Sequence, residues 1–286
     1  MSWINEVIKI NDNLYCIKDV QSVNKYLIIG MEKALLFDTG FGFVDFRPLV
    51  REITNRELIV VNSHADLDHV LGNYLFEEVY LSRYDYKNLQ INEQPELKQQ
   101  QLAHRLNKPG SRLAEEMGDP QSWLAQSIYK PTYHLIDAGF VFDLGNLQLE
   151  VIALPGHSSG SIALLERNNG WMFTGDSIME YNVFYMPAGN PPRLPEPMMV
   201  YYDSLLRVKT RMPEISFLYP GHGPFNIGSQ VILDTIANLE EIHSRRGVDE
   251  DFITYHGKAA KRHYYGKSLI YFVDEYVEPF RSQQIT

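Results

Sequence analysis

Short apolar segments with the alternation of strands open the chain, and polar turns separate them. The first three are rich in β-branched and aromatic side chains and are bounded by Asn, Asp and Gly. They are residues 6–10, 13–18 and 24–30. Two almost wholly apolar segments follow at 33–38 and 57–62, which is typical of strands buried on both faces. A helix over 44–53 is expected between them, so the start of the chain predicts a sheet with a crossover helix.

Residues 84–130 change to helix spacing. Gln, Leu, Glu and Ala dominate this block, and its apolar residues recur three and four positions apart, so two or three helices are expected. The block interrupts an α/β pattern and is therefore interpreted as an insertion. Insertions at the mouth of a site often act as lids, which favours a restricted entrance and a small substrate.

Strand and helix signals return in the second half of the chain. Strands are expected at 140–143, 147–153, 162–166, 171–174 and 215–219. Helices are expected at 199–212 and 230–245. The Asn169-Gly170 pair predicts a tight hairpin turn, because Asn-Gly readily adopts positive φ. A proline-rich loop covers 186–197, and the tail 248–286 has no clear pattern. We expect one domain over 1–247, with 248–286 as an extension packed on it.

Composition limits the classes of partner. The formal net charge is −10, which disfavours nucleic acid, and the basic run from Lys258 to His263 is expected to be a solvated helix face. No apolar run reaches membrane-span length and no signal peptide is recognised, so a cytoplasmic protein without a membrane partner is expected. The single cysteine, Cys16, lies in an apolar alternation and is expected in the core. Homodimer formation is possible, and the sequence does not decide it.

Candidate chemistry begins directly after the second buried strand. His64, Asp66, Asp68 and His69 fall within six residues there. Imidazole and carboxylate are ligands of Zn²⁺, Mn²⁺ and Fe. Taken alone, the segment could also be a polar turn that caps the next helix.

Three further segments decide between these interpretations. Each carries a His or an Asp beside glycine, just past the end of a predicted strand, where open α/β sheets build their sites. The residues are His157 in Pro-Gly-His, Asp176 in Thr-Gly-Asp and His222 in Pro-Gly-His-Gly. Four such segments in this order are hard to produce by chance, so the sequence predicts a metal centre.

The order of these segments resembles that of the metallo-β-lactamase superfamily up to about residue 245. The family pattern is His-x-His-x-Asp-His, then Gly-His, Gly-Asp and Gly-His-Gly. The resemblance implies a four-layer αββα sandwich, here with a helical insertion, and two divalent metal ions. Carried over by position, the ligands of one metal would be His64, residue 66 and His157; those of the other would be Asp68, His69 and His222; and Asp176 would bridge the two. Asp38 matches a supporting position that orients the ligand loop.

This chain departs from the family pattern at Asp66, where the pattern has His. Aspartate can still ligate, but it adds negative charge and makes the metal pair less electrophilic. Oxygen ligation also moves the preference from Zn²⁺ toward Mn²⁺ or Fe. Zinc is the metal that the family implies, and iron or manganese is the alternative that Asp66 raises.

The expected reaction is hydrolysis of a small ester, lactone, thioester or related bond by a metal-activated water, with Asp68 orienting that water and carrying the proton. Phe184 and Tyr185 follow the Gly-Asp segment and are candidates to line the substrate pocket. The alternatives are diiron redox chemistry of the flavodiiron kind, phosphodiester hydrolysis, and a metal-binding protein without turnover.

Overall fold

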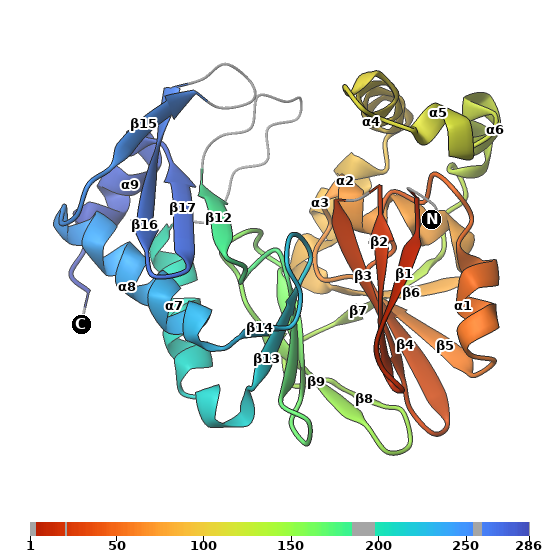
Figure 1. Cartoon of the computed structure of the whole chain (residues 1–286), viewed down its shortest axis with the longest axis horizontal. Helices are drawn as coiled ribbons and strands as arrows, with labels where there is room; N and C mark the ends of the chain where they lie inside the picture. Colours follow the sequence, from red (N-terminus) through yellow and green to blue (C-terminus); the bar gives the residue numbers. More distant parts are fainter. Residues whose placement is uncertain (1–3, 21, 185–197, 254–258, 286) are drawn as a thin grey trace. The chain divides into compact units, whose positions relative to one another are not determined.

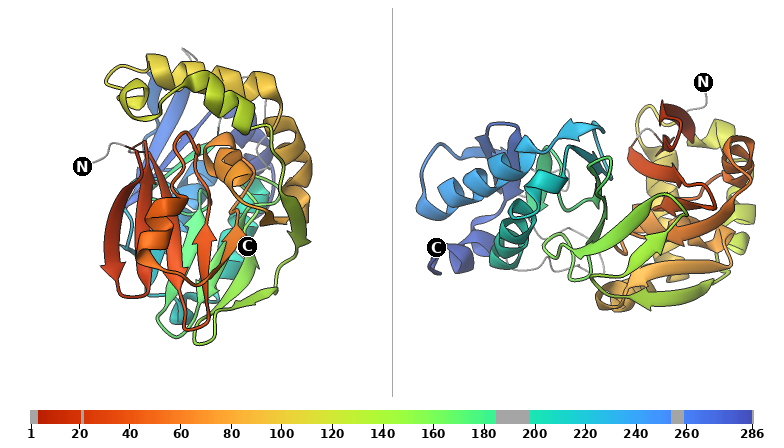
Figure 2. Two further views of the ribbon diagram at one scale, coloured as in Figure 1. Left: turned by 90° about the vertical axis from the view of Figure 1, so that its right-hand side faces the viewer. Right: turned by 90° about the horizontal axis from the view of Figure 1, so that it is seen from below.

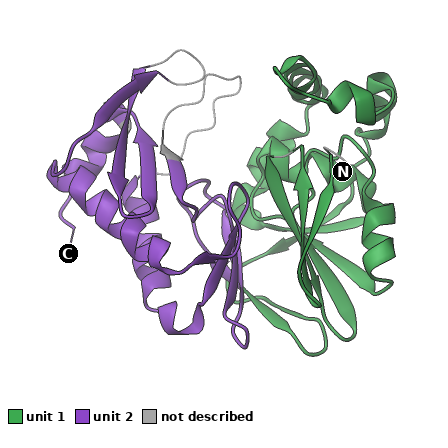
Figure 3. Ribbon diagram, in the orientation of Figure 1, with its two compact units in different colours: residues 1–150 green, residues 151–286 purple. Residues whose placement is uncertain are grey.

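The computed structural model describes the chain except residues 1–3, 21, 185–197, 254–258 and 286. Its helices and strands are labelled in Figure 1. They form two compact units, Met1–Glu150 and Val151–Thr286 (Figure 3). The expectation of one domain over 1–247 with a packed extension stays a prediction.

Unit 1 is built on a seven-stranded sheet whose spatial order follows the chain. Its strands are β1 (Glu6–Asn11), β2 (Leu14–Asp19), β3 (Val23–Ile29), β4 (Lys33–Phe37), β5 (Glu57–Val61), β6 (Glu78–Ser82) and β7 (Thr132–Ile136). The first four pair antiparallel, whereas β4 to β7 run parallel. Parallel strands end at the same edge, so the segments that follow β4, β5 and β6 start side by side.

The helical segments of unit 1 come mostly after β5 and β6. They are α1 (Arg47–Ile53), α2 (Leu67–Val70), η1 (Leu71–Leu75), η2 (Arg83–Asp85), α3 (Tyr86–Asn92), α4 (Pro95–Asn107), α5 (Leu113–Glu116) and α6 (Pro120–Gln126). Helix α1 starts three residues later than predicted, with a proline in its first turn, and its Val50 packs with Leu36 and Val60 of the sheet. The expected strands of this half are confirmed, but the sequence prediction missed β6 and β7.

The helical character expected for residues 84–130 is confirmed. Helices α4 to α6 lie at one end of the unit 1 sheet (Figures 1 and 2). Their buried side chains, including Leu102, Leu113 and Trp123, form a cluster with Phe43 of the loop after β4. Burial of each such leucine contributes roughly 1.5–3 kcal/mol. The Trp123 indole also donates to the Gly42 carbonyl at 2.8 Å, so the insertion is fastened to that loop.

A six-stranded sheet follows along the chain, in the order β14-β13-β11-β10-β9-β8, and it begins with the hairpin of β8 (Val141–Asp143) and β9 (Gln148–Ala153). The remaining strands are β10 (Ile162–Glu166), β11 (Trp171–Gly175), β13 (Phe217–Pro220) and β14 (Ile227–Gly228). The predicted hairpin is confirmed, since β10 and β11 pair antiparallel and Gly170 has a φ of +68°. Strands β11 and β13 are parallel, so Asp176 and His222 leave the sheet at the same edge.

A smaller sheet has the order β12-β17-β16-β15. Its strands are β12 (Tyr181–Phe184), β15 (Glu250–Ile253), β16 (Ala259–Tyr265) and β17 (Ser268–Phe272). The expectation of a helix face in the basic run is wrong, because residues 259–263 form part of β16. Pairing with β15 and β17 on both sides overrides the local propensity there. Lys258 lies outside the described residues.

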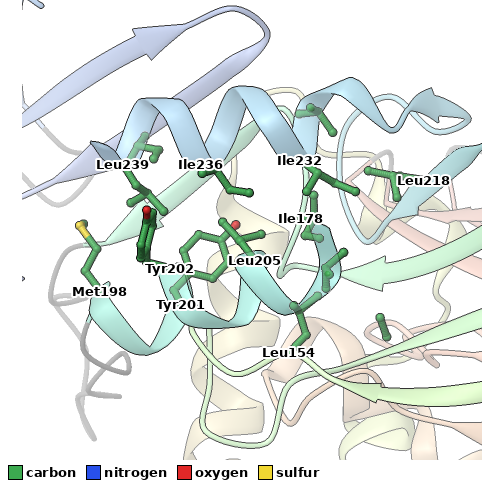
Figure 4. Packing of buried hydrophobic residues seen from close by; sticks show 14 of the residues in the cluster. Leu154, Ile178, Met198, Tyr201, Tyr202, Leu205, Leu218, Ile232, Ile236 and Leu239 are labelled. Atoms are coloured by element: carbon green, nitrogen blue, oxygen red, sulfur yellow. The ribbon is translucent and has the colours of Figure 1, made fainter. Parts of the chain in front are cut away.

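Helices α7 (Met198–Lys209), η3 (Met212–Glu214), α8 (Gln230–Ser244) and α9 (Asp274–Arg281) complete unit 2. The expected helices 199–212 and 230–245 correspond to α7 and α8. Their apolar faces pack together, with Tyr201 and Leu205 of α7 beside Ile236 of α8 (Figure 4). Among the described helices, none combines the length and the hydropathy needed to span a bilayer.

Candidate metal centre

The segment after β5, residues 63–69, is named here the ligand loop. Asp66 has extended backbone angles and stands at the N-cap of α2, which places Asp68 and His69 within that short helix. Three pairs of side chains in this loop have ligand atoms within 4.8 Å of each other. The pairs are His64 with Asp66, His64 with His69, and Asp68 with His69. The four candidate ligands from this loop are therefore one continuous cluster.

Asp38 holds the ligand loop from the end of β4. Its Oδ1 accepts from the Ser63 backbone N–H at 2.7 Å, and its Oδ2 accepts from the Ser63 hydroxyl at 2.8 Å. The same Oδ2 lies 2.8 Å from Nδ1 of His69. Asp38 is fully buried and has a φ of +68°, a backbone conformation that aspartate tolerates better than most residues. The structure thus places Asp38 where the sequence predicted a supporting carboxylate.

These contacts assign the protons on both histidines of the loop. A carboxylate only accepts, so His69 donates from Nδ1. The Ser63 hydroxyl gives its single proton to Asp38, so at 2.8 Å it accepts from Nδ1 of His64. Both neutral rings then carry their lone pair on Nε2. For His64, that nitrogen lies 3.5 Å from Oδ2 of Asp66.

Ala65, between the first two candidate ligands, is held at both of its backbone polar groups. Its N–H donates to Oδ2 of Asp85 at 2.7 Å, and its carbonyl accepts from the Asn92 side chain at 2.7 Å. Asp85 follows β6 and is fully buried, and Asn92 ends α3. The start of the helical insertion therefore fixes the path of the ligand loop.

The backbone of His69 is fixed by a buried amide cluster. Its carbonyl accepts from the Thr39 backbone N–H at 3.0 Å and from the Asn62 side chain at 3.2 Å. Asn73 ties these two together, since its Oδ1 accepts from Thr39 at 2.8 Å and its amide nitrogen donates to Asn62 at 2.8 Å. All three are buried, so these hydrogen bonds are shielded from water and hold their geometry.

In unit 2, two imidazoles face one carboxylate. Oδ2 of Asp176 lies 3.7 Å from Nε2 of His157 and 3.2 Å from Nε2 of His222. Their side chains are between 10% and 18% exposed. The Gly221 N–H donates to the Gly175 carbonyl at 2.8 Å, which joins the Asp176 segment to the His222 segment.

Tyr201 and Ser177 join the His157 segment to the Asp176 segment. A Cβ on Gly156 would lie 2.4 Å from the Tyr201 ring, and Gly156 has a φ of +153°, so glycine alone fits there. The Tyr201 hydroxyl donates to the Ser177 carbonyl at 2.6 Å, and the Ser177 hydroxyl donates to the Leu154 carbonyl at 3.1 Å. Burial raises the pKa of Tyr201, so its hydroxyl remains a donor at neutral pH.

The donor set fits a divalent metal. In unit 1, Nε2 of His64 faces the carboxylate of Asp66, and in unit 2 two imidazoles face one carboxylate oxygen. Such converging acceptors repel one another unless a cation or proton lies among them. Imidazole and carboxylate are ligands of zinc, iron and manganese, so the residues present suit the group that the family implies.

Of the two candidate substrate-binding residues, only one lies within the described part of the chain. Phe184 ends β12, where its backbone pairs with Phe272 of β17. Tyr185 lies outside the described residues. A role for either one in substrate binding stays a prediction.

Several residues that support the candidate ligands were not among those predicted from the sequence. Asp85, Asn92 and Tyr201 act through backbone groups of the ligand segments, and each is far from its contact in the chain. Asp85 offered one weak signal, because it is an acidic residue three positions after the end of a strand, β6. Tyr201 offered none, since helical spacing alone makes it a core residue.

The sequence is similar to a known protein family. The sequence profile of the metallo-beta-lactamase superfamily matches residues 19–222. A protein named probable metallo-hydrolase MJ0888, from Methanocaldococcus jannaschii, is 27% identical over 71% of this chain and 88% of its own length. The human acyl-coenzyme A thioesterase MBLAC2 is 28% identical over 55% of this chain, and the match spans only 58% of that protein.

Solved structures agree on the fold. A beta-lactamase domain protein from Burkholderia ambifaria superposes with a TM-score of 0.55 at 17% identity, covering 86% of this chain and 80% of that one. The predicted α/β sandwich fold of the metallo-β-lactamase type is therefore confirmed. The profile covers more than half of the 286 residues, and the related proteins are named as hydrolases. The chain belongs to the metallo-β-lactamase superfamily and is a metal-dependent hydrolase.

Proposed function

We propose that the chain hydrolyses a small carboxylic thioester or ester with the help of two divalent metal ions. The observation that carries this proposal is the network of Asp38, Ser63, His64 and His69, which presets both Nε2 lone pairs for coordination. The similarity to a protein named acyl-coenzyme A thioesterase supports a thioester among the substrates that the sequence leaves open. The net charge of −10 supports a small molecule over nucleic acid.

The candidate ligands divide into two sets by their places in the family pattern. His64, Asp66 and His157 would hold one ion, Asp68, His69 and His222 the other, and Asp176 would serve both. When bound, such ions polarise a carbonyl oxygen and make water more acidic. The close contacts of Asp176 with two imidazoles support its shared role.

The chain's own residues would perform the remaining steps. Asp38 keeps the Nδ1 proton on His69, so that ring cannot act as the general base through Nδ1. Asp68 sits beside His69 in the first turn of α2, and its carboxylate would take the proton of the attacking water. The carbonyl C–S or C–O bond then breaks, and Asp68 would return the proton to the departing thiolate or alkoxide. The products are a carboxylic acid and a thiol or an alcohol.

A matched substrate panel tests the proposal. The metal-loaded chain should hydrolyse short acyl thioesters or esters, lose that activity with a chelator, and regain it when Zn²⁺ or Mn²⁺ is returned. An Asp68→Asn variant should keep its metal more completely than its activity, because an amide can still offer an oxygen ligand but cannot take a proton. Hydrolysis of phosphodiesters alone would contradict the proposed bond class.

A second candidate function is diiron redox chemistry, which Asp66 specifically favours. A carboxylate at this position makes the site richer in oxygen ligands, and oxygen ligands favour iron over zinc. Purified chain that holds iron, shows a near-ultraviolet band and consumes O₂ with an electron donor would support it. Zinc or manganese content with thioester turnover would support hydrolysis instead.

A further inference from the structure

A pocket of about 390 Å³ lies within the helical insertion of unit 1, at the start of α4 and beside α6. Its volume falls in the range of small-molecule sites. The lining residues that matter for its chemistry are Glu93, Gln94, Lys98, Leu124, Ile128 and Lys130. None of them is a candidate metal ligand.

Lys98 is the buried charge of this pocket. The residue is only 5% exposed, and its ammonium donates to the Ser127 carbonyl. In the part of the chain that the structure describes, no carboxylate pairs directly with it. Burial lowers the pKa of Lys98, partly offset by the negative charge of Glu93. A buried ammonium next to a pocket gains stability from a negative group placed there.

The other charges of the pocket largely balance each other. The Lys130 ammonium lies 3.2 Å from Oε2 of Glu93, and Oε1 of Glu93 accepts from the Tyr133 hydroxyl at 2.5 Å. Burial, reinforced by the charge of Glu93, raises the pKa of Tyr133, so this phenol stays a donor. Glu93 is thus already engaged on both oxygens, and Lys98 leaves the pocket with one surplus positive charge.

The amino end of α4 adds to this positive character. Gln94 is the N-cap of that 13-residue helix, and its side chain makes no capping hydrogen bond. The partial positive charge of a helix amino end favours anions, although it is a weaker effect than the ammonium beside it. Leu124 and Ile128, which also line the pocket, offer apolar contact.

We propose that this insertion pocket binds a small organic carboxylate, with its negative group against Lys98 and its apolar part against Leu124 and Ile128. One surplus positive charge matches a carboxylate better than a phosphate, which carries nearly two negative charges at neutral pH. This site goes beyond the proposed hydrolysis and does not depend on it.

Calorimetric titration of the full metal-loaded chain tests the proposal, with butyrate and inorganic phosphate as probes. Butyrate should bind more tightly than phosphate. Lys98→Met should weaken carboxylate binding by roughly thirtyfold or more, because it removes one partner of a buried charge pair. Lys130→Gln should weaken it only about two- to fivefold, since that ammonium is exposed.

Lys87→Gln is the matched control, because Lys87 is exposed on α3 and does not line the pocket. It should bind the carboxylate as the parent chain does. Melting temperatures identify any variant that misfolds. On titration with the carboxylate, the amide chemical shifts of α4 and α6 must change. Absence of binding, equal binding by Lys98→Met, or tighter binding of phosphate would overturn the proposal. Because carboxylates can also bind metals, shifts confined to the ligand loop would overturn it too.

Discussion

The two groups of candidate ligands are held in different ways. In unit 1, four candidate ligands come from one loop of seven residues, and buried side chains such as Asp38 and Asp85 fix that loop through hydrogen bonds. In unit 2, three candidate ligands come from three separate segments, which glycine backbones and Tyr201 hold together. A contiguous ligand set needs neighbours that supply hydrogen bonds, whereas a dispersed set needs close backbone packing.

This contrast has a functional consequence. Hydrogen-bonded support in unit 1 also sets which nitrogen of each histidine carries its lone pair, so a change there alters the chemistry of the ligand. The contacts in unit 2 determine the backbone path of the three segments. A substitution there therefore shifts the position of a candidate ligand. The two kinds of support should respond differently to substitutions of similar size.

The largest effect is expected from removing a ligand. His69→Ala should reduce hydrolysis to background and remove bound metal, because His69 links the Asp68 and His64 parts of the cluster. His134→Ala is the control, since His134 is a partly exposed histidine on β7 outside the ligand set. Metal analysis and a thioester assay on both variants measure the effect, and metal retained by His69→Ala would contradict this ligand assignment.

Asp38→Asn tests the support in unit 1. An amide has one acceptor oxygen where the carboxylate serves three donors, and it no longer stabilises the Nδ1 proton of His69. Metal affinity should fall roughly 10- to 100-fold, the usual cost of losing such a supporting group. Asparagine tolerates the positive φ at this position, so folding should survive.

Chelator competition measures this metal affinity. Asp45→Asn is the control, because Asp45 is partly exposed and binds Arg47 away from the ligand loop. Equal affinity in the two variants would show that Asp38 does not support the ligands.

Tyr201→Phe tests the support in unit 2. The ring still packs on Gly156, but the hydrogen bond to the Ser177 carbonyl is lost. Metal affinity should fall roughly threefold to tenfold, in line with one buried hydrogen bond. The neighbouring Tyr202→Phe variant loses a bond to Glu240 instead and should leave metal affinity unchanged. If both variants lose only thermal stability, Tyr201 has no positioning role.

Asp66→His should have the smallest effect on overall metal affinity, but it should change which metal the chain prefers. It restores the family pattern and replaces an oxygen ligand by nitrogen, which favours zinc over manganese. Competition between Zn²⁺ and Mn²⁺ on the parent and variant chains measures this preference. An unchanged preference would indicate that Asp66, which is about one quarter exposed, does not ligate the metal.

The residues that could be predicted from the sequence are those whose role depends on local pattern, and those that could not be predicted depend on contacts between separate elements. The ligand loop and the glycine-flanked histidines stand beside strand ends, so local pattern was enough to single them out, whereas Asp38 was identified by the family resemblance. Asp85 and Tyr201 could not be recognised, because their roles arise only when separate elements meet. The basic run at residues 259–263 was misjudged for the same reason, since pairing with β15 and β17 determines its conformation.

Metal analysis of the purified full-length chain tests the central claim most directly. The account predicts close to two equivalents of zinc, manganese or iron per chain, with thioester or ester hydrolysis that is lost on chelation and restored by the metal. A chain that binds no divalent metal, or that hydrolyses its substrate fully after the metal is removed, would contradict it.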